Sequence, residues 1–283
     1  MVVLRVFPRR TELTPDDELA FVGDPPLWMP PADEVHVSCT FTWDIPEARR
    51  LVDAWRQYYP VVRLGGPAIG DKPNGFEPGQ YVRQGVTFTS RGCNNRCLFC
   101  LVPEREGRLR EYERIAPGYI INDNNFLQCS PFHRGKVYQM LARQPRAAIF
   151  AGGIQASLVD AEIAAELRDV RIKELFLAAD TAAALGAVSR AVDRLHWLGR
   201  RKLRCYVLIG YNGETLEQAE QRLEALWQAG VLPFAQLYQP AEGLIDYPRE
   251  WRDLARTWSR PAATFASHAE EAKGGRQQEQ FRG

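Results

Sequence analysis

The sequence has no long hydrophobic run, and none of its segments approaches the roughly 18 consecutive apolar residues that a membrane-spanning helix needs. Its first residues, MVVLRVFPRR, also lack the long apolar core and the small-residue cleavage site of a signal peptide. An excess of one charge is missing too, because 36 Lys and Arg stand against 35 Asp and Glu. We therefore expect a cytoplasmic protein with no membrane partner and no general attraction to polyanions.

Cysteine is scarce. Six cysteines in 283 residues are too few for the disulfide framework of a secreted protein. Three of the six are scattered singly along the chain, whereas Cys93, Cys97 and Cys100 fall within eight residues. This cluster indicates a metal site.

From Gly85 onward, β-rich runs alternate with helical patterns, and the centres of the runs fall about 30 residues apart. That spacing is the length of one strand, one helix and two connections in a parallel β/α repeat. The predicted strands are 86–90, 119–122, 147–151, 174–178, 204–210 and 234–238. The predicted helices are 131–144, 158–169, 182–198, 216–229 and 248–259.

Six such units fill about 180 residues, whereas a complete eight-unit barrel takes about 250. The sequence therefore predicts an α/β protein with a partial (β/α)6 TIM-like barrel over residues 85–262. A doubly wound sheet is the alternative, because periodicity does not fix the order of the strands. In either fold the ligand site lies at the carboxyl ends of the strands. Residues 263–283 are polar and are expected to form a disordered tail.

Residues 1–84 are predicted to hold a small α/β unit and a linker. Within them, 35–69 has the pattern of one β-α-β unit, with Asp44 as the helix N-cap, and the Gly- and Pro-rich stretch 65–80 is the linker. The exposed strand edge of so short a sheet must be covered. The barrel or residues 1–30 are expected to cover it, with Leu27, Trp28 and Met29 as anchors.

The cysteine cluster follows the first predicted barrel strand directly, in VTFTSRGCNNRCLFC, with the spacing C-x3-C-x2-C. Three thiolates there can bind three irons of a [4Fe-4S] cluster and leave the fourth iron open for chemistry. A zinc site with His133 as a fourth ligand is the competing metal interpretation. Three buried cysteines without a metal are the remaining alternative.

This segment resembles the signature of the radical S-adenosylmethionine superfamily, in which an aromatic residue, here Phe99, precedes the last cysteine. Its surroundings resemble most the branch whose barrel follows a cobalamin-binding-type domain, here shortened. The resemblance implies that the cluster binds S-adenosylmethionine and, once reduced, cleaves it to methionine and a 5′-deoxyadenosyl radical. That radical would abstract hydrogen from an unidentified substrate, which is a nucleotide, a nucleic acid or a peptide. A flavodoxin or a ferredoxin would supply the electron.

The resemblance also implies cofactor contacts after the second strand, where the run NDNN occupies the place of a motif that meets the methionyl amino group. Its candidates are Asp123, Asn124 and Asn125, with Phe99 as a further cofactor-binding residue, and Asp123 is the one whose carboxylate can accept from the ammonium directly. Asn and Asp runs also form plain turns, and this alternative stays open.

Further candidates follow the fourth and fifth strands. Asp180 is expected to contact the ribose or the carboxylate of the cofactor, or else to cap a helix. The backbone of Leu208, Ile209 and Gly210 is expected to line the adenine. Cys129 is a candidate for a substrate-side thiol or hydrogen donor, with core packing as the alternative.

We expect no cobalamin, because the short N-terminal unit has no Asp-x-His-x-x-Gly run that would supply an axial histidine. Methylthiotransferase activity is disfavoured as well, since those relatives carry three cysteines in the N-terminal domain and this chain has only Cys39 there. Two other functions stay open. One is a cobalamin-dependent radical methyltransferase, and the other is a zinc-stabilised binding module without turnover.

Overall fold

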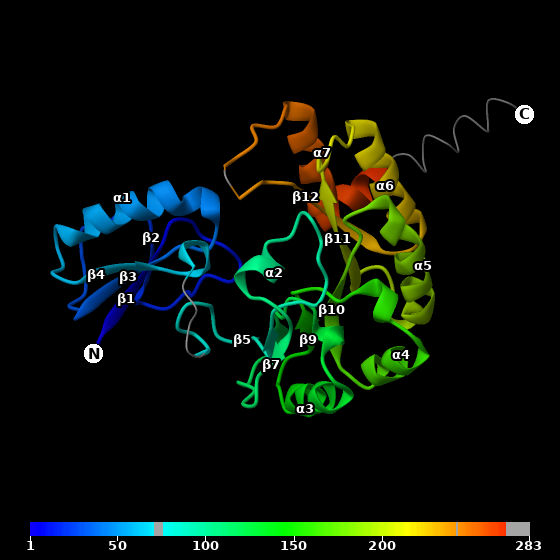
Figure 1. Cartoon of the computed structure of the whole chain (residues 1–283), viewed down its shortest axis with the longest axis horizontal. Coiled ribbons are helices and arrows are strands. Elements are labelled where there is room, and N and C mark those ends of the chain that lie inside the picture. Colours follow the sequence, from blue (N-terminus) through cyan, green and yellow to red (C-terminus); the bar gives the residue numbers. More distant parts are fainter. Residues whose placement is uncertain (71–75, 242, 270–283) are drawn as a thin grey trace, which may run out of the picture. The chain divides into compact units, whose positions relative to one another are not determined.

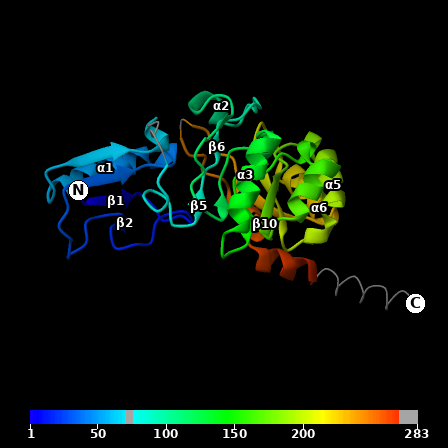
Figure 2. The same ribbon diagram turned by 90° about the horizontal axis from the view of Figure 1, so that it is seen from below.

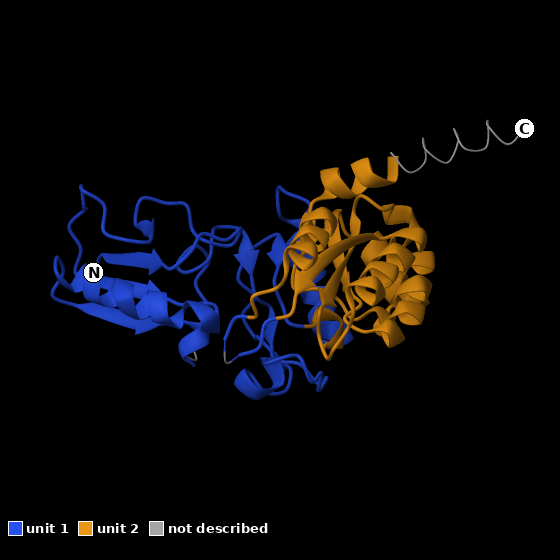
Figure 3. Cartoon of the chain, turned by 90° about the horizontal axis from the view of Figure 1, so that it is seen from above, with its two compact units in different colours: residues 1–124, 129–147, 239–244 blue, residues 125–128, 148–238, 245–283 orange. Residues whose placement is uncertain are grey.

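The computed structural model describes residues 1–70, 76–241 and 243–269 (Figure 1). The chain divides into two compact units, which Figure 3 shows in different colours. Unit 1 comprises Met1–Asn124, Cys129–Ala147 and Gln239–Leu244, and unit 2 comprises Asn125–Gln128, Ala148–Tyr238 and Ile245–Gly283. Within the described ranges, no helix is both long and apolar enough to cross a membrane.

The N-terminal part of unit 1 is a four-stranded parallel sheet in the order β2-β1-β3-β4. Its strands are β1 (Val3–Phe7), β2 (Ala20–Val22), β3 (Glu34–Ser38) and β4 (Val62–Gly65). Helix α1 (Ile45–Arg56) connects β3 to β4 and lies along one face of the sheet (Figure 1). The predicted β-α-β unit is confirmed, and the sequence missed β1 and β2, of which β1 is an interior strand.

The core of this sheet is apolar on the face that α1 covers. Leu51 and Trp55 of the helix are buried there together with Val6 of β1. The indole nitrogen of Trp55 donates to the carbonyl of Gly23 at 3.1 Å. The predicted cap is wrong in its detail, because Asp44 precedes α1 but its side chain makes no capping hydrogen bond. Its carboxylate is instead paired with the guanidinium of Arg9.

On the opposite face of the sheet, polar side chains of β1 and β3 contact residues 79–81. Arg5 of β1 donates to the carbonyls of Gly79 and Gln80 at 3.0 and 2.8 Å. Nδ1 of His36 lies 2.6 Å from the hydroxyl of Tyr81. Residues 79–81 thus bind to this face of the sheet through hydrogen bonds.

The predicted apolar anchors of this unit are largely wrong. Leu27 and Trp28 are 90% and 87% exposed, and of the three only Met29 packs against the core. The physical reason is the run of prolines around them, which keeps the segment Asp24–Asp33 an irregular connection between β2 and β3. The expectation that residues 1–30 cover the edge of the sheet is confirmed in another way, because β1 pairs with β3 along that edge.

All six predicted barrel strands are present. They are β5 (Val86–Thr87), β8 (Ile120–Ile121), β9 (Ala148–Phe150), β10 (Ile172–Ala178), β11 (Leu203–Ile209) and β12 (Leu232–Leu237). In unit 1, β5 and β8 pair in parallel. In unit 2, β9 to β12 are parallel neighbours in their sequence order. A doubly wound sheet has a point where that order reverses, and these four strands have none. The α/β class with parallel sheets is confirmed, and the partial barrel stays a prediction.

The five predicted long helices are also confirmed. They are α3 (Pro131–Ala142) in unit 1 and, in unit 2, α4 (Ala161–Arg168), α5 (Leu185–Arg194), α6 (Leu216–Gln228) and α7 (Arg249–Ser259). Helices α5 and α6 lie on the same side of the unit 2 strands (Figures 1 and 2). Alternate residues of β11, from Leu203 to Ile209, are buried, which is the period-2 pattern of a strand with one face in the core. Cys205 is one of them and is a core residue.

The polar C-terminal stretch was predicted to be disordered, and residues 263–269 contradict this because 261–269 are helical. Aromatic contacts explain the order, since the ring of His268 stacks on Trp227 with centroids 4.1 Å apart. Nε2 of His268 also lies 2.9 Å from the carboxylate of Glu224 on α6. The remainder of the predicted tail, 270–283, lies outside the described residues.

Candidate functional site

The cysteines lie on a loop that a short hairpin holds at its base. Strand β6 (Ser90–Arg91) leads into the loop and pairs in antiparallel fashion with β7 (Arg110–Glu111), which follows it. The amide of Cys93 donates to the carbonyl of Gly107 at 3.1 Å, so both ends of the loop are tied together. Gly92 has φ +85, and a Cβ there would collide with the carbonyl of Arg108. Only glycine fits this point of entry.

The three thiols have different environments. Cys93 and Cys100 are half-buried, and Cys97 is exposed. The amide of Cys100 donates to the carbonyl of Cys97 at 3.0 Å, and helix α2 (Val102–Arg105) begins two residues later. Phe99 is half-buried between them. Over residues 1–70, 76–241 and 243–269, no three His, Cys, Asp or Glu side chains are grouped as a metal site.

Asp123 has different partners from the predicted one. Its carboxylate is 1% exposed and accepts from the amide of Thr89 at 2.6 Å, from the hydroxyl of Thr89 at 2.5 Å and from the hydroxyl of Ser90 at 2.8 Å. Burial raises the pKa of Asp123, and these hydrogen bonds oppose the rise. The side chain is thus committed to the residues that lead into the cysteine loop, in place of the expected contact with a cofactor ammonium.

Asn124 contacts the loop directly. Its Oδ1 accepts from the amide of Gly92 at 2.9 Å, and the carboxylate of Glu106 lies 3.2 Å from the same amide. Glu106 is also paired with Arg91, whose guanidinium lies over the ring of Phe88. Asn124 and Asp123 therefore hold the residues before Cys93. The NDNN run is more than a plain turn.

Asn125, the last predicted residue of that run, belongs to unit 2. Its amide nitrogen donates to Oε1 of Gln155 at 3.0 Å. The structure brings Asp123 and Asn124 to the cysteine loop of unit 1, and it gives Asn125 a partner in its own unit.

His133 and Cys129 lie next to the hydrogen bonds that join Asp123 to Thr89 and Ser90. Nε2 of His133 is 3.2 Å from the hydroxyl of Thr89, and Nδ1 is 3.8 Å from the carboxylate of Glu111. Because that hydroxyl donates to Asp123, it accepts from Nε2–H of His133. Burial lowers the pKa of His133, which favours the neutral ring. In this tautomer the ring's lone pair, which the zinc alternative needs, is on Nδ1, the nitrogen nearer Glu111.

Cys129 is buried, and burial raises the pKa of its thiol to about 12. A thiol that ionises so late in a closed environment is inert toward solutes. The geometry therefore favours core packing over the substrate-side role considered for this residue.

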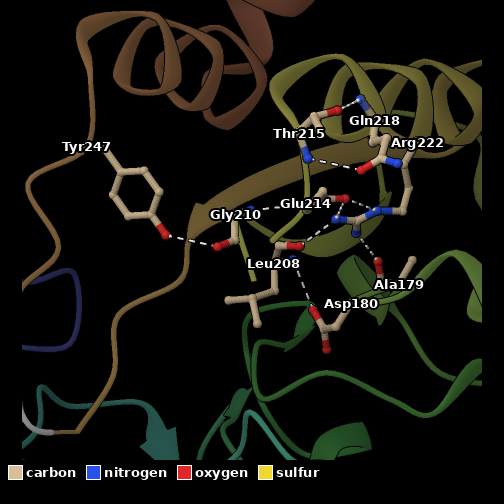
Figure 4. Close-up of polar contacts among 9 residues, drawn as sticks. All are labelled: Ala179, Asp180, Leu208, Gly210, Glu214, Thr215, Gln218, Arg222 and Tyr247. Carbon is tan, nitrogen blue, oxygen red and sulfur yellow. Dashed lines mark hydrogen bonds and ion pairs between the residues drawn. The ribbon is translucent and has the colours of Figure 1, made fainter. Parts of the chain in front are cut away.

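A second polar cluster lies at the carboxyl ends of β10 and β11 in unit 2 (Figure 4). Its centre is Arg222 of α6, which is 5% exposed and pairs with the carboxylate of Glu214. The same guanidinium donates to the carbonyls of Ala179 and Leu208, each at 2.7 Å. Ala179 directly follows β10, and Leu208 is the penultimate residue of β11, so Arg222 ties together the carboxyl ends of these two neighbouring strands.

The sequence reasoning missed Arg222. The available signal was its position, since a charged residue falls at 222 among Ala219, Leu223 and Leu226 on the apolar stripe of α6. A charge on such a stripe requires a buried partner, because an unpaired one is costly in the core. Glu214, which stands just before helix α6, is that partner.

The predicted residues around this cluster are already engaged. Oδ1 of Asp180 accepts from the amide of Leu208 at 3.1 Å, and burial raises the pKa of Asp180. The helix-cap alternative for Asp180 is wrong, because the short helix that follows is preceded by Thr181 and has no side-chain cap. The amide of Gly210 donates to Glu214 at 2.9 Å, and its carbonyl accepts from Tyr247 at 3.3 Å.

Ile209 completes this strand end. Its side chain is buried, and its carbonyl accepts from the amide of Tyr238 at 2.9 Å. The backbone of Leu208–Gly210 thus serves the protein's own contacts, and a cofactor could meet it only through van der Waals contact.

Neither a scan against models of known protein families nor a search of curated proteins found a match to this chain. The functional argument therefore depends on the motif and its surroundings. The candidate residues form two sets, one beside the cysteine loop in unit 1 and one at the strand ends in unit 2.

Proposed function

We propose that the chain is a radical S-adenosylmethionine enzyme whose [4Fe-4S] cluster is held by Cys93, Cys97 and Cys100. The observation that carries the proposal is the C-x3-C-x2-C loop, with Phe99 before its last cysteine, which follows the parallel strand β5 and the short strand β6. When bound, the cluster and S-adenosylmethionine supply methionine and a 5′-deoxyadenosyl radical that abstracts hydrogen from the substrate.

The donor set fits such a cluster. Three soft thiol ligands on one short loop suit iron and sulfide, and they leave one iron for a further ligand. A closed zinc site needs four protein ligands, and His133, the candidate for the fourth, is buried with Nε2 3.2 Å from the hydroxyl of Thr89 and Nδ1 3.8 Å from the carboxylate of Glu111. We therefore retain the zinc-stabilised binding module only as the alternative.

The chain's own residues hold the loop in place. Asp123 fixes Thr89 and Ser90 by three hydrogen bonds, and Asn124 fixes Gly92. Gly107 accepts from the amide of Cys93 on the other side of the hairpin. A loop tied on both sides has fewer conformations to lose when its three thiols gather around a cluster.

Other parts of the proposal rest on the resemblance alone. They are the partial barrel, the contacts of Asp180 and of Leu208–Gly210 with the cofactor, and an electron donor such as flavodoxin or ferredoxin. The N-terminal sheet is proposed to be a structural unit without cobalamin. Added cobalamin should accordingly leave the melting temperature and the activity unchanged, whereas stoichiometric retention through desalting would favour the methyltransferase alternative.

Anaerobic reconstitution with iron and sulfide tests the cluster. We expect a brown protein with about four irons per chain, and loss of both iron and colour when the three loop cysteines are replaced by Ala. The triple variant Cys39→Ala, Cys129→Ala and Cys205→Ala is the matched control and should keep its iron. A colourless protein with one zinc per chain would instead support the binding module.

The substrate class can be screened with the same material. Nucleotides, nucleic acids and peptides are added in turn to the reduced, reconstituted protein, and 5′-deoxyadenosine is measured. The true substrate class should raise its formation, because the radical then has a proper hydrogen donor.

A further inference from the structure

A phenol, an imidazole and a carboxylate lie in one hydrogen-bonded row on the N-terminal sheet of unit 1. Nδ1 of His36 on β3 is 2.6 Å from the hydroxyl of Tyr81, and Nε2 is 2.9 Å from the carboxylate of Glu34. The rings of His36 and Tyr81 are nearly parallel, with an angle of 11° between their planes. These three side chains, the Tyr81 triad, take no part in the two sets of candidate residues described above.

The partners of the imidazole decide which of its nitrogens carries the proton. Hydrogen bonds from His36 and from Arg63 lower the pKa of Glu34, so its carboxylate is charged at neutral pH and can only accept. In the neutral ring, Nε2 of His36 therefore carries the proton and donates to Glu34. Nδ1 keeps its lone pair and accepts from the hydroxyl of Tyr81. A base that is oriented by an acid and bonded to a hydroxyl has the arrangement that activates a nucleophile.

Contacts with the neighbouring strands hold the Tyr81 triad in position. Nε and Nη2 of Arg63 on β4 each lie 2.9 Å from a carboxylate oxygen of Glu34. Arg5 on β1 donates to the carbonyls of 79–80, directly before Tyr81. The backbone that carries the phenol is thus tied to the sheet that carries the imidazole. Groups held in this way lose little conformational freedom when they react.

The Tyr81 triad is within reach of small molecules. Tyr81 is 37% exposed, and the side chain of His36 is 23% exposed. The buried polar groups beside the cysteine loop differ in this respect, since Asp123 and His133 are 1% and 2% exposed. A reagent in solution can therefore meet the phenol together with its base.

We propose that Tyr81 is a nucleophile that takes the acyl group of a small activated ester, with His36 as its general base and Glu34 as a positioning residue. Oη of Tyr81 attacks the acyl carbon, and its proton passes to Nδ1 of His36. The bond between the acyl carbon and the leaving oxygen breaks, and that oxygen takes the proton from Nδ1. A tyrosyl ester and a free alcohol result, and nothing is oxidised or reduced. The inference is independent of the proposed function.

An acyl donor fits the Tyr81 triad better than a phosphoryl donor does. Transfer of a phosphoryl group needs cations that neutralise the charge on its oxygens. Arg5 and Arg63 flank His36 on the neighbouring strands. Their guanidiniums are already paired with the carboxylates of Asp17 and Glu34. An acyl group develops a single negative charge, which water can solvate at an exposed site.

The test incubates the full chain with p-nitrophenyl acetate at neutral pH, and mass spectrometry of its peptides measures the acetylation of each tyrosine with time. Tyr58 is the internal comparison, because it belongs to the same unit and is 58% exposed. Exposure alone would make Tyr58 react faster than Tyr81. We expect Tyr81 to react at least about tenfold faster, since a positioned general base contributes about 10²–10⁴-fold.

Variants separate activation by the base from simple exposure. His36→Gln should slow the acetylation of Tyr81 at least about tenfold and leave that of Tyr58 within about twofold. The matched control, His196→Gln, changes an exposed histidine of unit 2 and should alter neither rate. Glu34→Ala should slow the acetylation of Tyr81 as well. Glu34→Gln should restore part of that rate, because its amide oxygen can still accept from Nε2.

The wild type alone can overturn the proposal, whether or not the variants fold. Acetylation of Tyr81 that is no faster than that of Tyr58 would show that the hydrogen bonds of Tyr81 only attach its segment to the sheet. An acetyl group found on His36 in place of Tyr81 would make the imidazole the nucleophile. An unchanged rate at Tyr81 in a His36→Gln variant with the wild-type melting temperature would exclude the base.

Discussion

Replacing Asp123 by Ala should destabilise unit 1 more than any other single change behind the cysteine loop. The substitution removes the acceptor of three hydrogen bonds in a buried place. The two hydroxyls can rotate toward other acceptors, but the amide of Thr89 cannot turn. Hydrogen bonds to a charged group contribute about 1.5–3 kcal/mol each, and an unsatisfied buried donor costs about 1–3 kcal/mol.

The net loss is smaller than the sum of these terms, because the variant no longer buries a carboxylate. We therefore expect the free energy of unfolding to fall by about 2–4 kcal/mol in urea titrations at neutral pH. Asp123→Asn is the matched control. Its amide oxygen can still accept from the amide of Thr89, so it should lose only about 1 kcal/mol.

The pH dependence gives a second readout. Because burial raises the pKa of Asp123, the folded chain holds, at pH values between the ordinary and the raised pKa, a proton that the unfolded chain has released. The resulting stability is fully present below the ordinary carboxyl pKa of about 3.9 and is lost as pH rises through the raised value. The advantage of the wild type over Asp123→Asn should thus be largest in acid and decline toward neutral pH. If Asp123→Ala unfolds at the same urea concentration as the wild type, this view of the network is wrong.

Three other predictions follow from the buried polar groups. Arg222→Met removes the guanidinium that pairs with Glu214 and donates to the carbonyls of Ala179 and Leu208. The free energy of unfolding, measured by thermal unfolding, should therefore fall by about 3–5 kcal/mol. The double variant Arg222→Met, Glu214→Gln should regain part of this free energy. Burial lowers the pKa of His133, so its contribution to stability is present above about pH 6.5 and is lost as the pH falls through the lowered value. His133→Gln should accordingly flatten the acid limb of the stability curve, and an unchanged limb would exclude this role. Cys129, whose pKa is raised to about 12, should react with iodoacetamide far more slowly than Cys97 at pH about 8, as mass spectrometry of peptides would reveal.

Local periodicity was sufficient to predict the strands and helices of the β/α repeat from the sequence. In β11 every second residue from Leu203 to Ile209 is buried, and this alternation is visible in the sequence. It was not sufficient for β1, where Arg5 interrupts an apolar run. Arg5 is accommodated because it reaches the carbonyls of Gly79 and Gln80, and no local pattern foretells a partner 74 residues away.

The candidate site shows the same limit. The cysteine spacing is local, so the loop could be predicted directly from the sequence. The role of Asp123 could not, because its partner Thr89 lies 34 residues earlier and meets it only through the pairing of β5 with β8. The choice between cofactor contact and loop support depended on which way that carboxylate points, and strand register decides this.

The most direct test of the central claim is the amount of 5′-deoxyadenosine that the reconstituted, reduced chain forms from S-adenosylmethionine, measured by liquid chromatography and mass spectrometry. The account predicts slow formation without substrate, and none when Cys93, Cys97 and Cys100 are replaced by Ala. A chain that holds about four irons yet forms no more 5′-deoxyadenosine than a protein-free control would contradict it. Equal formation by the triple Ala variant would contradict it as well.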